Sequence, residues 1–580
     1  MRSFRFLTIL LFIVLTTIIS NAQNPVLTDE QKLKQKRQLD LIEQILADTK
    51  NLKLAENRAL IYAQTGNLFW GTDEKRARRL FQASIDELIN AQNLAESSKK
   101  NAAYMNDLIM SQSLRPNILQ IVGNRDAELA LASLARSRPS KIVKALAEFP
   151  ANVEKKSASG YSTELYLVQQ ETGLEQRLTA LAADQNPERA VRLLKEALKR
   201  PITYDTLNLL KKLHQKDSAA ADEIADEVLQ KLLKVDYDDP KNGNSLNAAI
   251  SLLSEAARER SEGEKSLVFD ETRTRNLADL IISSMLEASD RNNWYSLAAL
   301  ITIAQKLAPS RVEVLKQKSA KFNGFNGFGY NSEAAELLQG DATAEKLITE
   351  ADKFPANYKQ QLYVKAASKY AEQGNFELAR KTLTGNLSDD ELENALASFN
   401  WQMAMKATGE GRFDAALEYI DLLPENSRFN SLLELANAVY QKNPENKTYA
   451  VSILERARAF VSDKPEDSTE MSYLFNLISA YAAIEPNEAF RLFESLIPQI
   501  SALSDASALL GGFNRSSNVR QGEFIITYSN AFGLYLGEID TALRNLTKAD
   551  FDRTIKLTDA FERRETRIYL KLKLAENVIN

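Results

Sequence analysis

The sequence predicts an all-α protein in which antiparallel helix pairs stack into an α-solenoid. Apolar residues recur at helical spacing over most of the chain, as at Leu39, Ile42 and Ile45. Runs of β-branched residues are short, and no long stretch alternates apolar and polar residues, so a sheet is not expected. In the second half, an alanine-centred pattern returns at nearly constant intervals, which is the mark of a repeat architecture.

The composition fits a globular protein and excludes several other classes. The 580 residues include no Cys, 1 His, 14 Pro and 20 Gly, and 44% are hydrophobic. Disulfide-stapled and collagen-like chains are therefore excluded. The 73 basic and 78 acidic residues give a formal net charge of -5, which does not favour nucleic acid or anionic lipid as a partner.

The first 22 residues have the pattern of a secretory signal peptide. Arg2 and Arg5 precede an apolar run at 6–19, and Ser20-Asn21-Ala22 supplies small residues for cleavage. The alternative is an uncleaved membrane anchor, which is less favoured because such a run rises only about 21 Å as a helix. We expect cleavage near Ala22, a secreted or periplasmic location, and no membrane span in the mature chain.

Residues 23–320 are predicted to form a divergent block of helix pairs. Helical periodicity is clear here, for example at Ala77, Leu80 and Phe81. The alanine-plus-large pattern occurs at Ala77-Phe81, Ala130-Leu134 and Ala190-Leu194, at spacings of 53 and 60 that do not hold a period. This block is followed by a loop at 321–331, in which Gly and Asn separate Phe322, Phe325, Phe328 and Tyr330. Those aromatic residues either form an exposed adhesive surface or, as we favour, tuck into the junction.

Residues 332–510 carry the regular repeat. The pattern places an Ala early in a helix and a large apolar residue four positions later, so that two helices approach closely and the larger side chain fills the adjacent hole. It recurs at spacings of 35, 37, 34 and 39, at Ala344, Ala379, Ala416, Ala450 and Ala489. Gly374 and Gly411 precede two of these helices and supply the tight turn of a helix hairpin.

These residues resemble tetratricopeptide repeats, whose unit is a 34-residue helix-turn-helix. Tyr363, Ala367 and Tyr370, which precede Gly374, also suit the first helix of that unit. The resemblance is good over roughly 333–500 and partial elsewhere, and the segment from Leu68 to Ala77 resembles uncharacterised bacterial exported helical-repeat proteins. It implies a right-handed solenoid and supplies no activity.

Residues 511–580 are predicted to form a C-terminal helical cap. Gly511-Gly512-Phe513-Asn514 marks a break before it. A solenoid needs a polar end to avoid stacking on copies of itself, and Arg563, Arg564, Glu565 and Arg567 suit that role.

No residue pattern predicts a catalytic, metal or cofactor site. His214 lies among cations near an expected helix end and is predicted to be a surface residue, and without a second His or any Cys the common zinc and Cys-His mechanisms are excluded. The glycines at 324–329 and Gly263-Glu264-Lys265-Ser266 depart from phosphate-binding motifs and are predicted to be loops. Trp70, Trp294 and Trp401 are expected to pack between helices.

The leading functional hypothesis is an exported, non-enzymatic scaffold that binds a protein or peptide on a concave helical surface. The alternative is a carbohydrate-active or carbohydrate-binding protein of the cell envelope, which would use carboxylates and aromatic residues in a helical cleft. A third hypothesis is a structural spacer that associates with itself.

Overall fold

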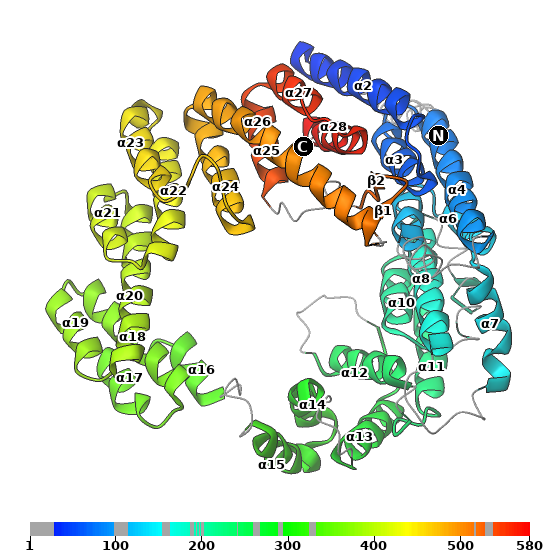
Figure 1. Cartoon of the computed structure of the whole chain (residues 1–580). Coiled ribbons are helices and arrows are strands. Elements are labelled where there is room, and N and C mark those ends of the chain that lie inside the picture. The colour runs from blue at the N-terminus through cyan, green and yellow to red at the C-terminus, as the bar shows by residue number, and fades with distance from the viewer. Residues whose placement is uncertain are drawn as a thin grey trace, which may run out of the picture.

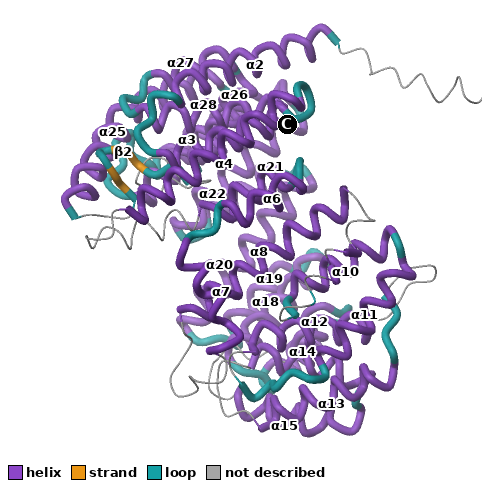
Figure 2. Tube along the Cα trace, turned by 90° about the vertical axis from the view of Figure 1, so that its right-hand side faces the viewer, coloured by secondary structure: helices purple, strands orange, loops and turns teal. Residues whose placement is uncertain are grey.

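The structure, a computed structural model, describes residues 28–97, 114–152, 163–185, 202–239, 242–258, 267–287, 294–323, 332–514, 518–527 and 538–579, with 191, 192, 194, 195 and 198. These residues are almost all helical, as the sequence predicts, and the helices stack in sequence as a solenoid. Figure 2 shows that two short strands interrupt the helices near the end of α25 (Pro486–Phe513).

The solenoid bends into a ring, in which the first and last described helices lie side by side (Figure 1). The first described helix, α2 (Asp29–Thr49), packs against the last, α28 (Arg564–Ile579), which also contacts α3 (Ala55–Phe69). The largest buried apolar cluster therefore contains residues from both ends, such as Leu41 and Leu574. A curved solenoid was predicted from the sequence, but the contact between its ends was not.

The N-terminal half of the ring is a chain of helix pairs of unequal length. After α2 and α3 come α4 (Glu74–Ser97), a helical segment at 114–123, α6 (Ala127–Arg136), α7 (Ser140–Asn152), α8 (Thr163–Gln185), α10 (Tyr204–Lys216), α11 (Ser218–Leu232), α12 (Gly243–Ala257), α13 (Glu271–Glu287), α14 (Trp294–Leu307), a 3₁₀ turn at Pro309–Arg311 and α15 (Val312–Asn323).

The C-terminal half is more regular. Its elements are α16 (Ser332–Gln339), α17 (Ala344–Ala351), α18 (Ala356–Glu372), α19 (Phe376–Thr384), α20 (Asp389–Glu410), α21 (Phe413–Asp421), α22 (Glu425–Lys442), a 3₁₀ turn at Pro444–Asn446, α23 (Lys447–Arg458), α24 (Ser468–Ile484), α25, the strands β1 (Val519–Arg520) and β2 (Glu523–Phe524), α26 (Ile539–Ala549), α27 (Phe551–Asp559) and α28.

The predicted repeat is present, and its small residues lie where the packing argument requires them. The five repeat alanines, Ala344, Ala379, Ala416, Ala450 and Ala489, are at most 2% exposed and lie within the first four residues of α17, α19, α21, α23 and α25. Gly374 and Gly411 adopt positive φ angles of 79° and 78°, which lets the chain turn sharply into the next helix. In the N-terminal half, Ala77 and Phe81 are fully buried, and Gly66 lies so close to Phe81 that a Cβ there would meet its ring at 2.7 Å.

The structure differs from the sequence prediction at the start of the C-terminal cap. α25 continues through Gly511 and Gly512 to Phe513, where a break was expected. Two glycines in the last turn of a long helix are tolerated, because their low helix propensity is small beside the stability of the preceding turns. The next described residues form the antiparallel pair β1–β2, in which Val519 lies opposite Phe524.

Several predicted features lie outside the described residues. These are the signal peptide at 1–22, the aromatic loop from Gly324 onward, the Gly263–Ser266 segment and Ala190. Among the described helices, none combines the length and the apolarity needed to cross a membrane.

A buried polar contact joins the N-terminal and C-terminal helices of the solenoid. We call this contact the clasp and define it by Asn57, Glu523 and the backbone around them. The Glu523 carboxylate accepts hydrogen bonds from Lys53 N at 2.7 Å, Leu54 N at 3.2 Å and Asn57 Nδ2 at 2.7 Å. Asn57 Oδ1 in turn accepts from Ile526 N at 2.7 Å, and Asn57 Nδ2 also donates to the Phe524 carbonyl. Glu523 thus caps the N-terminus of α3 from the other end of the chain, since Leu54 supplies no side-chain cap.

Candidate binding pocket

The single histidine lies in a structural position. His214 is in the last turn of α10, as predicted, but it is only 7% exposed, so the expectation of a surface residue is wrong. It is buried because α11 begins at Ser218 and folds back against α10, which places Asp222 Oδ1 3.7 Å from His214 Nε2. Among the described residues, no group of three His, Cys, Asp or Glu side chains is placed to hold a metal ion.

The tryptophans divide between packing and exposure. Trp70 packs on Phe81, with ring centroids 5.9 Å apart, and Arg78 lies over its ring, so the packing expectation is confirmed there. Trp401 on α20 is 47% exposed, which corrects the same expectation for that residue. It lies on the side of α20 away from Ala395 and Phe399, which face the core. The side chain of Trp294 lies outside the described part of the chain.

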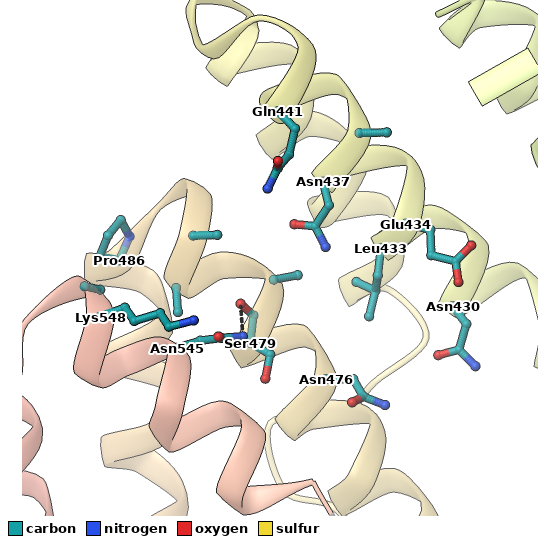
Figure 3. Close-up of a pocket in the computed structure, with 15 residues that line it drawn as sticks. Asn430, Leu433, Glu434, Asn437, Gln441, Asn476, Ser479, Pro486, Asn545 and Lys548 are labelled. Carbon is teal, nitrogen blue, oxygen red and sulfur yellow. Dashed lines mark hydrogen bonds between the residues drawn. The ribbon is translucent and has the colours of Figure 1, made fainter. Parts of the chain in front are cut away.

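A pocket of about 890 Å³ lies between α22, α24 and α26 (Figure 3). In Figure 1, α22 and α24 form the inner layer of the ring, and α21 and α23 lie outside them. Since α22 packs most extensively on α23 of the outer layer and its Ala436 and Val439 are fully buried, the opposite face of α22 is turned to the inside of the ring. The pocket is therefore on the concave side of the solenoid.

Carboxamides dominate the polar lining of this pocket. On α22, Asn430, Glu434, Asn437 and Gln441 recur at successive turns and form one stripe. The polar residues contributed by α24 and α26 are Asn476, Ser479, Asn545 and Lys548. Figure 3 shows Asn437 and Gln441 directed across the pocket toward Lys548 and Asn545. Only one carboxylate and one ammonium line the pocket, so its recognition chemistry is largely that of uncharged donors and acceptors.

Most of this hydrogen-bonding capacity is unused within the described part of the protein. Asn545 Nδ2 donates to the Ser479 carbonyl at 3.4 Å, but the side chains of Asn430, Asn437 and Asn476 form no hydrogen bond with other described residues. The Ser479 hydroxyl is buried and likewise lacks a partner among them. Because this hydroxyl is buried within the wall, the carboxamides are the uncharged groups that a molecule in the pocket can bond.

No site residue was predicted from the sequence, and this pocket was not foreseen. The stripe on α22 was visible as polar residues spaced by four, three and four positions on the face opposite the apolar residues. Asn545 could not be assigned to the same place, because it approaches Ser479 from 66 residues away.

Comparison with known proteins leaves the function open. No family model matches the chain, and no curated protein matches it. One solved structure found by comparison is described as a "Circular tandem repeat protein with novel repeat topology and enhanced subunit contact surfaces". It is 14% identical, over 93% of this chain and 94% of that one, with a TM-score of 0.16.

Proposed function

We propose that this chain is an exported, non-enzymatic scaffold with TPR-like repeats, which binds an extended peptide segment of a protein partner in the concave pocket. The observation that carries the proposal is that the pocket carboxamides of Asn430, Asn437 and Asn476 bond no other described residue.

Carboxamides suit a peptide backbone because each offers a donor and an acceptor in one plane, as a peptide group does. Asn430 and Asn437 lie two turns apart on α22, about 10 Å along the helix axis. Three residues of an extended peptide also span about 10 Å. The side chains of Asn430 and Asn437 are therefore spaced to form hydrogen bonds with two separate peptide groups of one extended backbone. Glu434, between them, and Lys548, across the pocket, provide one charge of each sign for orientation.

The proposal can be tested by panning a random dodecapeptide display library against the full mature chain. We expect enriched peptides whose binding falls at least about tenfold in N437L, since one or two buried hydrogen bonds are lost and their partners are left unpaired. N93L is the matched control, because Asn93 is exposed on α4, away from the pocket. Peptides that bind N437L as well as the wild type, or the absence of any enriched peptide, would contradict the proposal.

Carbohydrate binding is a second candidate, favoured by the exposed Trp401 ring on α20, the helix that packs beside α22. The pocket itself holds one carboxylate, Glu434, and so does not provide the pair used in glycoside hydrolysis. A glycan array probed with the wild type and with W401A separates the candidates. Glycan binding that is lost in W401A, without peptide binding, would favour this alternative.

Export is proposed from the sequence pattern at 1–22. In the native host, we expect the mature chain to begin at Gln23 and to be found in the periplasm or the medium. Mass spectrometry of its N-terminal peptide tests this expectation, and a chain that retains Met1 would overturn it.

A further inference from the structure

The last three turns of α25 carry an unusual surface. The residues exposed on one side are all apolar, and they are Ala502, Leu503, Ala506, Leu509, Leu510 and Phe513. Leu503, Leu509, Leu510 and Phe513 are 43%, 78%, 60% and 85% exposed. At 100° per residue, the six fall within about a third of the helix circumference, so they form one continuous apolar stripe. We call this surface the α25 stripe.

The other residues of the same turns are held in the fold. Ala508 packs with Val519 and Phe524 of the two strands, and Asp505 accepts a hydrogen bond from Arg563 at 2.9 Å. The orientation of α25 is therefore fixed by the hairpin and by the start of α28. The stripe faces away from these contacts, and its exposure follows from that orientation rather than from a free helix end.

The α25 stripe has the spacing of a helix–helix seam. Leu503, Ala506, Leu510 and Phe513 are separated by three, four and three residues, as at the a and d positions of a heptad. The order of sizes also makes the stripe complementary to itself. When two copies run antiparallel about a twofold axis near Ala508, Leu510 of each faces Ala506 of the other, and Phe513 faces Leu503. At these four positions, each residue therefore faces one of a different size.

The size of the stripe matches a modest dimer interface. Its four large side chains together expose on the order of 500 Å², which is at the upper end of apolar patches on monomeric proteins. Pairing two copies would bury about 1,000 Å² in total, near the lower limit for a specific interface. The stripe carries no charged or hydrogen-bonding side chain that would select a polar partner.

From these observations we propose that two copies of this chain associate through an antiparallel, isologous contact between their α25 stripes. The proposal is independent of the peptide pocket, since α25 contributes only Pro486 to that pocket.

The first test is the mass of the full mature chain by analytical ultracentrifugation across a micromolar concentration series. We expect a reversible monomer–dimer equilibrium whose dissociation constant rises at least about 30-fold in L510E, because a carboxylate would be buried at the centre of the seam. L94E is the control, since Leu94 on α4 is an equally exposed leucine, and circular dichroism verifies that both variants fold. A wild type that stays monomeric at 100 µM, or a dimer that is unchanged in L510E, would overturn the proposal.

The absence of cysteine from the sequence permits a second test that does not depend on destabilisation. One preparation carries A506C and the other L510C, and the two are mixed under mild oxidation. We expect a disulfide-linked heterodimer to form faster than either homodimer, since these positions face each other across the axis. Mixing A506C with L94C is the control. Equal rates in the two mixtures would contradict the antiparallel pairing.

Discussion

Removing the Glu523 carboxylate should loosen the contact between the two ends of the ring. In the wild type, this 5% exposed side chain accepts from Lys53 N, Leu54 N and Asn57 Nδ2. E523A leaves the backbone N–H groups of Lys53 and Leu54 unpaired at the start of α3, where the loss of a helix cap costs about 1 kcal/mol. A hydrogen bond to a charged group is worth about 1.5–3 kcal/mol. Because these terms overlap, we expect the clasp to open about 3 kcal/mol more easily.

The assay is amide hydrogen exchange of the full chain, followed for peptides covering 50–60 and 518–527. A cost of about 3 kcal/mol corresponds to about 100-fold faster exchange in these segments, provided that exchange occurs by local opening. E523Q should give a smaller change, because its carbonyl oxygen still accepts a hydrogen bond. E313A is the control, since Glu313 forms an exposed pair with Lys316 and should change exchange nowhere near the clasp. Protection of 50–60 that is unchanged in E523A would refute the reasoning.

Three further predictions concern the repeats. G374A should lower the free energy of unfolding by about 1 kcal/mol, because φ is 79° at that position. G409A should raise the free energy of unfolding by about 1 kcal/mol, because Gly409 lies inside α20 with open space around it. Urea titrations of the two variants check these opposite signs. A416L should cost about 1–3 kcal/mol, because that alanine is fully buried between helices, and a urea midpoint equal to that of the wild type would contradict this packing. Hydrogen bonds from the Arg491 guanidinium lower the pKa of Glu488 to about 2. This carboxylate therefore stabilises the fold above its unfolded pKa near 4.5, and that stability is lost as the pH falls toward 2. E488Q should reduce the pH dependence of the unfolding free energy by about 1 kcal/mol, which is measured as the difference in thermal midpoint between pH 6 and pH 3.

The features that the sequence predicted correctly are those set by neighbouring residues. Ala416 is buried because it lies in the first turn of the second helix of a pair, and Gly411 has a positive φ because it ends the first helix. Both follow from rules that act within one helix pair. The buried position of His214 was not predicted, because it depends on how the next helix folds back.

The features that the sequence did not predict depend on contacts between distant segments. Asn57 and Glu523 are 466 residues apart, and no local pattern indicates that they meet. The pocket likewise combines α22 and α24 with α26, which lies beyond the predicted end of the repeat block at 510. Small angular differences between helix pairs accumulate along a solenoid, and they determine whether its ends join.

Closure of the ring is the claim on which the enclosed inner face depends, and a distance between the ends measures it directly. The sequence contains no cysteine, so nitroxide labels react only at the introduced positions K36C in α2 and K556C in α27. Both positions lie near the ion pair between Arg37 and Asp552, whose atoms are 2.7 Å apart. Because helices in contact lie about 10 Å apart, we predict a narrow distribution of label distances below about 30 Å in a double electron–electron resonance experiment. A broad distribution centred at a much longer distance would show that the solenoid is open and would contradict the account.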